Sequence, residues 1–247
     1  MKVKIANFIE NSLIDVLGEI SFVIWFSGCN FRCPWCFSSQ AVNGEGKFVE
    51  IDYILEKIKE NKFLIKYVQV TGGEPTLQID ALEELFFKVK EIGLKCSLDT
   101  NSSNPEAVKR LVKNRLIDHY ATDIKTVLID NSYWKVTGIK INGITEKIKR
   151  SLKIAKKVKF VEIRTTYVPS LLSNEDIENA WREVKKILKD AIFVLQQFYP
   201  METLVDKNFL NEKIVNHKEL VNIAKNLKEK LKLEKVYVRS KFGVEKI

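Results

Sequence analysis

An alternation of strand and helix patterns runs along most of the chain and restricts its fold more than any other feature. Six short apolar runs rich in β-branched residues indicate buried strands, and an amphipathic helical pattern follows each of them. The six runs are 20–26, 66–70, 94–98, 117–121, 159–166 and 191–198. Because consecutive strand–helix units produce parallel strands joined by helical crossovers, we expect an α/β protein with a parallel sheet.

Six units are too few to close an ordinary eight-stranded barrel. The sequence therefore predicts an open, partial (βα)6 TIM-type barrel of parallel strands, with a doubly wound sheet as the alternative. We expect one domain over residues 1–247, in which residues 1–19 form a hairpin or lead-in and residues 216–240 form a C-terminal helix and edge strand. The length of 247 residues suits one large α/β domain.

Three cysteines at the spacing C-x3-C-x2-C follow the first of these strands. Cys29, Cys33 and Cys36 lie in the loop 27–40. Three thiolates on one short loop can converge on one metal centre, and a [4Fe–4S] cube normally takes four protein ligands. A cube held here would keep one iron with an open coordination position, where a small molecule could chelate it. The spacing therefore favours an iron–sulfur site.

A structural zinc site and a thioredoxin-like redox pair stay open from the residues alone. A closed zinc site needs a fourth ligand, and the only other cysteine and histidines are Cys96, His119 and His217. A redox pair of Cys33 and Cys36 would leave Cys29 without a role. Cys96 falls inside a predicted strand, so we expect it to be a core thiol rather than a ligand.

Further polar motifs lie at the ends of the predicted strands. They are Thr71-Gly72-Gly73-Glu74-Pro75, Asp99-Thr100-Asn101, Asp123-Ile124-Lys125 and Arg164. Each motif alone could be a turn or a helix cap. Because the carboxyl ends of parallel strands meet at one edge of the sheet, we expect these motifs to surround one cavity together with the cysteine loop.

The composition of the chain limits the classes of binding partner and the cellular compartments that we expect. The net charge is +9, with 41 basic and 32 acidic residues, and Lys alternates with Glu along the helices. This pattern indicates a solvated surface rather than a nucleic-acid interface. No apolar run approaches 20 residues and no signal pattern follows Met1, so we expect no membrane span. The clustered cysteines favour a reducing, cytoplasmic compartment.

The cysteine spacing with Trp35, followed by Thr71–Pro75 after the next strand, resembles the radical S-adenosylmethionine (SAM) superfamily. The resemblance implies a [4Fe–4S] cluster on Cys29, Cys33 and Cys36, with SAM chelating the fourth iron. It also implies reductive cleavage of SAM to a 5′-deoxyadenosyl radical that abstracts hydrogen. Trp35, Gly72 and Gly73 would then lie against SAM, and Glu74 would either offset positive charge in the SAM site or hold the turn.

The small size and single cluster resemble the glycyl-radical-enzyme activases. Asp99-Thr100-Asn101 and Asp123-Ile124-Lys125 are similar to the Asp-Thr-Asn and Asp-x-Lys motifs of that branch. The resemblance implies that Asp99, Thr100 and Asp123 hold a monovalent cation near SAM. It also places Thr100, Asp123, Lys125 and Arg164 in the SAM site. A cation there would offset carboxylates that face the carboxylate of SAM.

Within this branch the chain most resembles the activating proteins of anaerobic ribonucleoside-triphosphate reductase. The matching segments are Ser12–Gly18, Val194–Pro200 and Val238-Arg239. Two features depart from the formate-lyase activases: Asp15-Val16-Leu17-Gly18 replaces their Asp-Gly-Pro-Gly, and Phe37 replaces a common His. The resemblance implies a glycyl radical enzyme as protein substrate in anaerobic cells, and a low-potential electron donor such as flavodoxin or ferredoxin.

Two other functions stay open. One is a radical SAM enzyme that acts on a small molecule or nucleotide, such as an enzyme like 7-carboxy-7-deazaguanine synthase. A pocket closed by loop 126–142 or loop 199–215 would favour it, whereas an activase needs a wide mouth for a polypeptide. The other is a non-catalytic iron–sulfur or zinc protein.

Overall fold

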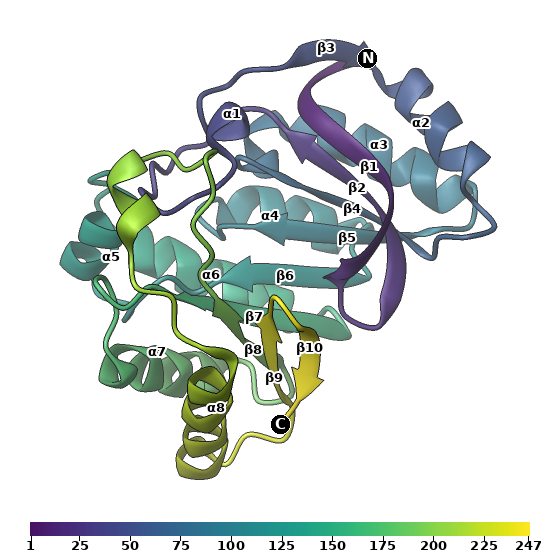
Figure 1. Ribbon diagram of the computed structural model, residues 1–247. Coiled ribbons are helices and arrows are strands. Elements are labelled where there is room, and N and C mark those ends of the chain that lie inside the picture. Colours follow the sequence, from purple (N-terminus) through teal and green to yellow (C-terminus); the bar gives the residue numbers. More distant parts are fainter.

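One mixed sheet of ten strands runs through the computed structural model, which describes residues 1–247 (Figure 1). Its strand order is β10-β9-β8-β7-β6-β5-β4-β2-β1-β3. The strands are β1 (Lys2–Val16), β2 (Glu19–Phe26), β3 (Lys47–Glu50), β4 (Tyr67–Gly72), β5 (Lys95–Thr100), β6 (His119–Asp123), β7 (Phe160–Tyr167), β8 (Ile192–Gln197), β9 (Val236–Ser240) and β10 (Gly243–Lys246).

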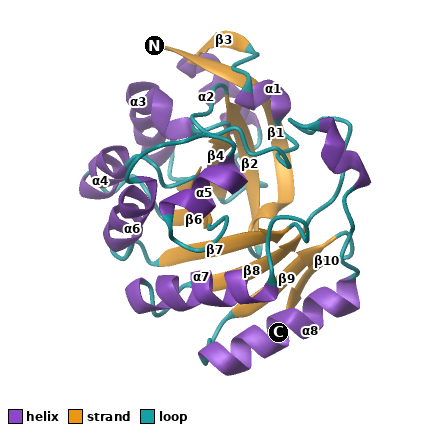
Figure 2. Ribbon diagram, turned by 90° about the vertical axis from the view of Figure 1, so that its left-hand side faces the viewer, coloured by secondary structure: helices purple, strands orange, loops and turns teal.

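Eight α-helices and two short 3-10 helices connect the strands. They are α1 (Ser39–Val42), α2 (Ile51–Glu60), η1 (Pro75–Gln78), α3 (Ile79–Glu91), α4 (Pro105–Lys113), α5 (Asp130–Thr137), α6 (Ile144–Ala155), α7 (Asn174–Ile187), η2 (Lys207–Asn211) and α8 (His217–Leu231). Most of the helices cover the outer face of the curved sheet, as Figure 2 shows from the end at which the parallel strands finish.

The parallel part of the sheet confirms the predicted fold class. Strand β2 and strands β4 to β9 pair in parallel, each with its neighbour. The six predicted strand–helix units are present, and the predicted edge strand is β9, which adds one more parallel strand. The sheet stays open because antiparallel strands end it on both sides, β1 and β3 on one and β10 on the other.

The N-terminal lead-in is a long strand rather than a short one. β1 pairs antiparallel with β2 through a turn at Gly18, whose φ of +74° is readily adopted by glycine. Register shifts after Ile9 and Ser12 bend β1 along its length. The short strands β3 and β10 were not predicted, because their mostly exposed residues show no alternation of apolar and polar side chains.

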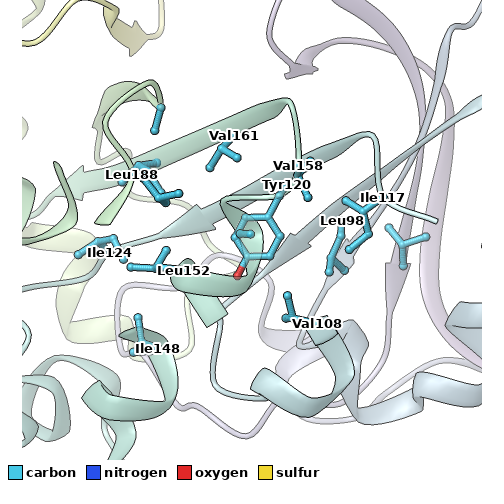
Figure 3. Packing of buried hydrophobic residues seen from close by; sticks show 14 of the residues in the cluster. Leu98, Val108, Ile117, Tyr120, Ile124, Ile148, Leu152, Val158, Val161 and Leu188 are labelled. Carbon is cyan, nitrogen blue, oxygen red and sulfur yellow. The ribbon is translucent and has the colours of Figure 1, made fainter. Parts of the chain in front are cut away.

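The outer face of the sheet carries the hydrophobic core. Helix α6 buries Ile148 and Leu152, and α4 buries Val108 and Leu111, at the spacing that places them on one side of each helix. Figure 3 shows these helices packed on the strands that carry Leu98 and Tyr120, among other residues of the cluster. The helix ends follow sequence signals: Asn104 caps α4 with Pro105 at its first position, and Ser173 and Asp176 form a capping box on α7.

Two segments treated as loops in the sequence contain structure of their own. Residues 126–142 include α5, which begins at Asp130 and ends at a left-handed Gly138. Residues 199–215, called the strap below, include the 3-10 helix η2. Both segments lie at the carboxyl edge of the parallel strands, beside the cysteine loop (Figure 1). None of the helices is both long enough and apolar enough to cross a membrane.

Candidate functional site

A cavity of about 540 Å³ opens at the carboxyl edge of the parallel strands. It brings together all but one of the site residues predicted from the sequence. Its lining includes Cys29, Cys33, Trp35, Cys36, Gly72, Gly73, Asp99, Thr100, Asp123, Lys125 and Arg164. The predicted convergence of the motifs is therefore confirmed, because strands of one sheet deliver them to the same edge. Glu74 is the predicted residue that the lining does not include.

The cysteine loop is fixed by backbone hydrogen bonds from three separate parts of the chain. The N–H of Glu74 donates to the carbonyl of Gly28 (2.7 Å), and the N–H of Arg32 donates to the carbonyl of Thr137 at the end of α5 (2.8 Å). From the strap, Asp206 N–H donates to Pro34 and Val205 N–H donates to Cys36, each at 2.9 Å. A loop without regular structure is thus held in one conformation by β4, α5 and the strap.

The three thiols are largely buried and form a soft donor set. Burial raises the pKa of Cys29 to about 12 and that of Cys33 to about 11, and it also raises the pKa of Cys36. A metal ion reverses this preference, because a coordinating thiol is deprotonated. The indole Nε1 of Trp35, between two of the cysteines in the sequence, is buried without a hydrogen-bond partner.

The donor set is the one that a three-cysteine cluster would use. Cys29, Cys33 and Cys36 line the same cavity, and in a cube each thiolate would bind a different iron. The fourth cysteine does not take part, since Cys96 is buried in the core near the carbonyl of Phe86. The residues present therefore fit a three-cysteine cluster.

Lys125 supplies a positive charge next to the cysteines. Its Nζ lies 5.0 Å from the centre of the Trp35 ring and has no carboxylate within ion-pair distance. Burial lowers the pKa of Lys125, but the neighbouring Cys33, Asp123 and Cys36 outweigh this and raise it overall. Lys125 therefore stays protonated at neutral pH, and a lysine can bind an anionic group in the cavity.

Gly72 and Gly73 allow the cysteine loop to approach β4 closely. A Cβ on Gly72 would lie 2.2 Å from the carbonyl oxygen of Phe26, and a Cβ on Gly73 would lie 2.1 Å from that of Gly28. Gly72 also has a φ of +121°. Both positions therefore exclude any other residue without movement of the backbone. Both glycines line the cavity, and their contact with SAM stays a prediction.

The side chain of Glu74 is buried beneath the cavity wall and does not line the cavity. Its fully buried carboxylate accepts hydrogen bonds from Thr76 N–H (3.0 Å), Thr100 Oγ1 (2.7 Å) and Asn101 N–H (2.7 Å). Burial raises the pKa of Glu74, while these hydrogen bonds lower it. With its oxygens engaged in this way, Glu74 connects the loop after β4 to the loop after β5 and so holds the turn. A contact between Glu74 and SAM stays a prediction.

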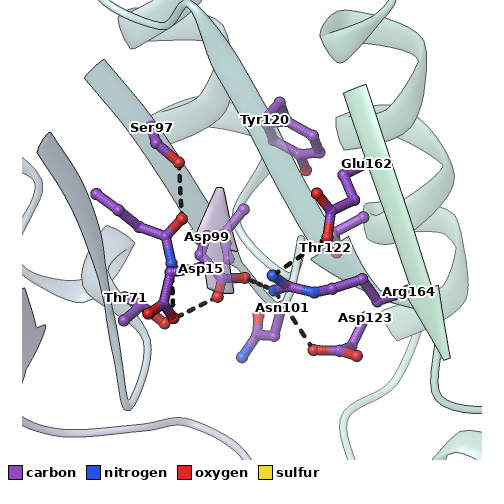
Figure 4. A network of polar contacts seen from close by, with 12 residues as sticks. Asp15, Thr71, Ser97, Asp99, Asn101, Tyr120, Thr122, Asp123, Glu162 and Arg164 are labelled. Atoms are coloured by element: carbon purple, nitrogen blue, oxygen red, sulfur yellow. Dashed lines mark hydrogen bonds and ion pairs between the residues drawn. The ribbon is translucent and has the colours of Figure 1, made fainter. Parts of the chain in front are cut away.

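Arg164 lies among the acidic residues that were predicted to hold a cation. Its guanidinium donates a hydrogen bond to Asp99 and lies 3.6 Å from Asp123 (Figure 4). Burial raises the pKa of Asp99, and the positive charge of Arg164 opposes this. The hydroxyl of Thr100 is engaged by Glu74. Arg164 therefore already places a positive charge between the two carboxylates, and a bound monovalent cation stays a prediction.

Two charged residues of the site, Glu162 and Arg239, were not identified from the sequence as site residues. Arg239 of β9 lines the cavity and donates to Glu162 Oε1 (3.0 Å) and Gln196 Oε1 (2.8 Å). Glu162 is fully buried and also faces His119 Nε2 at 3.6 Å. Burial alone would raise the pKa of Glu162. The neighbouring His119, Arg164 and Arg239 together have a larger effect in the opposite direction, so the pKa is lowered to about 2. The sequence signal that could have identified Glu162 is a charged residue among the apolar residues of a predicted strand.

The mouth of the cavity carries large apolar side chains that remain exposed. Ile14 of β1 is 59% exposed, Phe37 of the cysteine loop 56%, and Tyr199 and Met201 of the strap 51% and 46%. All four line the cavity. Exposed apolar side chains that gather around a cavity indicate that another molecule covers them.

Comparison with known proteins gives a family match over most of the parallel sheet. The model of the Radical SAM superfamily matches residues 23–187. A protein of Methanocaldococcus jannaschii that bears the name glycyl-radical enzyme activating enzyme MJ1227 is 32% identical over 233 residues, 93% of each chain. The 7-carboxy-7-deazaguanine synthase of Aquifex aeolicus is 28% identical over 174 residues, 70% of each chain.

Solved structures show the same fold at low sequence identity. QueE from Escherichia coli superposes with a TM-score of 0.58 at 15% identity, over 96% of this chain and 94% of that one. Streptococcus suis SuiB bound to the precursor peptide SuiA gives a TM-score of 0.66 at 19% identity, over 89% of this chain and 48% of that one. Several cavity residues, among them Ile14, Tyr199 and Arg239, lie outside the residues that the family model matches.

Proposed function

The chain belongs to the radical SAM superfamily, and from this premise we propose that it activates a glycyl radical enzyme of the anaerobic ribonucleotide reductase type. Its substrate would be a glycine in a polypeptide loop of that partner. Support for an activase comes from the 32% identity, over 93% of both chains, to a protein named as a glycyl-radical enzyme activating enzyme. The choice of the reductase type rests only on the resemblance of the segments Ser12–Gly18, Val194–Pro200 and Val238-Arg239.

Cys29, Cys33 and Cys36 would hold the [4Fe–4S] cluster, because they are the three thiols that line one cavity. When bound, the cluster supplies the electron that cleaves SAM to methionine and a 5′-deoxyadenosyl radical, which takes a hydrogen atom from the glycine. Lys125 and Arg164 offer positive charge to the SAM carboxylate, and Asp123 offers negative charge to its ammonium group. Trp35, Gly72, Gly73 and Thr100 would form the walls around it.

The observation that carries the choice of a protein substrate is the mouth. Ile14, Phe37, Tyr199 and Met201 are about half exposed or more, and they surround the entrance from three parts of the chain. A small substrate would lie inside the cavity and leave these side chains in water. A polypeptide loop that reaches into the cavity would cover them, which is favourable by roughly 25 cal/mol per Å² of apolar surface.

The test is to mix the anaerobically reconstituted protein with SAM, dithionite and an anaerobic ribonucleotide reductase. We expect a glycyl radical doublet by electron paramagnetic resonance, together with 5′-deoxyadenosine. Cys33→Ser should lose both signals to background, because two cysteines cannot hold the cluster. Cys96→Ala is the matched control, and it should retain both, since Cys96 lies in the core away from the cavity.

Formation of 5′-deoxyadenosine without a protein radical would contradict the activase proposal. That outcome would favour the second candidate, an enzyme that acts on a small molecule or nucleotide. Two observations support this candidate: the identity to a 7-carboxy-7-deazaguanine synthase, and the strap that packs over the cysteine loop. The polar floor of the cavity at Gln196 and Arg239 could also bind such a ligand.

The electron donor in the cell would be a low-potential carrier such as flavodoxin or ferredoxin. The activase reaction needs one electron for each SAM that is cleaved. The proposed cluster would pass this electron to SAM, and an external carrier would have to reduce the cluster first. The proposed reaction would need an anaerobic, reducing compartment, and the clustered cysteines favour the cytoplasm.

A further inference from the structure

The two flanks of the cysteine loop carry opposite charge. On one side, residues 126–145 contain Lys135 and Lys140 and a single acidic residue, Asp130, while Lys125 before them lines the cavity. On the other side, the strap contains the acidic residues Glu202, Asp206 and Glu212 and the basic residues Lys207 and Lys213. Arg32 is the only charged residue of the cysteine loop between Ser27 and Ser38. The surface beside the cysteines is therefore polarised.

Arg32, Lys135 and Lys140, called the basic face below, lie on or beside the C-terminal end of α5. The backbone of Arg32 is in contact with the end of α5, because its N–H donates to Thr137 and its carbonyl oxygen would lie 2.4 Å from a Cβ on Gly138. Lys135 and Lys140 are exposed on and just after that helix, and Lys140 Nζ lies 4.8 Å from the centre of the Trp134 ring. Figure 1 shows α5 next to the cysteine loop.

The charges of the basic face are not compensated within the protein. Some basic residues elsewhere on the surface have carboxylate partners, such as Lys88 with Asp52 and Arg150 with Glu106, whereas others, such as Lys156 and Lys157, have none. None of Arg32, Lys135 and Lys140 has a carboxylate within ion-pair distance. Asp130, the acidic residue of this flank, is engaged by Gly143 N–H (2.7 Å) and Thr145 N–H (3.0 Å).

The guanidinium of Arg32 folds back onto the cysteine loop, where it donates to the carbonyls of Cys29 (2.5 Å) and Phe31 (2.7 Å). The basic face thus begins at the outer surface of the loop whose inner side carries the thiols. A protein docked on it would come close to the proposed cluster. A short separation is what a one-electron carrier needs, and complementary charge speeds its association.

We propose that Arg32, Lys135 and Lys140 form the docking surface for an acidic one-electron carrier protein. This inference rests on the proposed function, because it requires a cluster on the three cysteines. In the step, the reduced carrier gives up one electron and the oxidised cluster gains it. The apolar mouth includes Phe37, Tyr199 and Met201, which belong to the loop's far end and to the strap.

The test compares the wild type with a Lys135→Glu/Lys140→Glu double variant, with an acidic flavodoxin as the probe. Arg32 is left unchanged because its side chain bonds the cysteine loop. We expect the Kd for the flavodoxin to rise about tenfold or more at low ionic strength, and the rate of cluster reduction by flavodoxin hydroquinone to fall by a similar factor. The difference should shrink at high salt, where surface charges are screened.

The matched control is Lys156→Glu/Lys157→Glu, which makes the same change in net charge at the end of α6, at the opposite edge of the sheet. It should bind flavodoxin like the wild type. SAM cleavage driven by dithionite should be unchanged in both double variants. An unchanged Kd and salt dependence in the Lys135→Glu/Lys140→Glu variant would overturn the docking surface. Absence of dithionite-driven SAM cleavage in the wild type would instead overturn the proposed function.

Discussion

The two faces of the parallel sheet are built from the same strands but differ in the side chains that they carry, which are apolar on the outer face and largely polar or charged on the inner face. On the outer face β5 presents Leu98 and β7 presents Ile163, both fully buried under helices. On the inner face the adjacent positions are Asp99 and Glu162 or Arg164, which belong to a polar network. Because successive side chains of a strand point to opposite sides, one strand can serve a core and a site at once.

The comparison shows where stability and chemistry are located. The outer face is stabilised by apolar burial, which is non-directional and tolerates exchange of one apolar residue for another. The inner face is stable only while each buried charge keeps its partners, because an unpaired buried charge is strongly unfavourable. The following three predictions test this contrast, from the largest expected effect to the smallest.

Removal of the central inner carboxylate should cost the most. Glu162→Ala leaves Arg239 without its 3.0 Å partner and leaves His119 and Arg164 facing an empty position. We expect the free energy of unfolding to fall by about 3–5 kcal/mol, measured by urea denaturation. Glu106→Ala is the control: its ion pair with Arg150 is mostly exposed, so the loss should stay below about 1 kcal/mol. Equal losses would show that the inner network contributes no special stability.

The same carboxylate should make stability depend on acid pH. The pKa of Glu162 is lowered from an ordinary value of 4.5 to about 2 in the folded protein. Its contribution is therefore fully present above pH 4.5 and is lost as the pH falls toward 2, by on the order of 3 kcal/mol.

The measurement is the difference in unfolding free energy between the wild type and Glu162→Gln as a function of pH. The variant lacks the titrating group, so the difference should shrink below pH 4.5. Burial raises the pKa of Glu74 and Asp99, which acts with the opposite sign, but both groups are present in both proteins and cancel. A difference that is constant from pH 6 to pH 3 would contradict the assignment.

A pair of adjacent threonines on β7 offers the finest comparison. Thr165 on the outer face is buried, accepts a hydrogen bond from Trp181 Nε1 (2.9 Å) and donates to the carbonyl of Ile124 (2.9 Å). Thr166 on the inner face lines the cavity and accepts from Gln196 Nε2 (3.1 Å). Water can replace the hydroxyl only in the cavity.

We expect Thr165→Val to lower the free energy of unfolding by about 1–3 kcal/mol, because it leaves buried partners unsatisfied. Thr166→Val should change it by less than about 0.5 kcal/mol. Thermal and urea unfolding of the two variants side by side provide the measurement. A larger loss from Thr166→Val than from Thr165→Val would reverse the assignment of the two faces.

Much of the site could be predicted because it depends on order along the chain. Cys29, Asp99 and Asp123 each lie at or just after the end of a parallel strand, so their meeting at one edge follows from the alternation of strands and helices. Glu74 could not be placed in this way. Its motif position puts it at the edge, but whether its carboxylate faces the cavity or the next loop depends on local packing.

The residues that were missed share a different property. Glu162 and Arg239 are 77 positions apart and belong to no common motif. Their role depends on the ion pair between them, which the sequence does not reveal. The structure of segment 126–142 was missed for a related reason. The helix α5 has only eight residues, and its buried face is defined by contacts with the rest of the protein. One of these contacts is the hydrogen bond from Arg32 N–H to the carbonyl of Thr137 at the end of the helix.

The sequence by itself determined the fold class, the cysteine set and the edge of the sheet at which the site lies. These follow from local periodicity and from the fixed direction of parallel strands, which need no knowledge of distant contacts. Only the tertiary structure decided which acidic groups are paired, which residues form the mouth, and that charge is divided across the cysteine loop. Those properties arise between segments far apart in the chain, where packing and burial set the energy of each charged group.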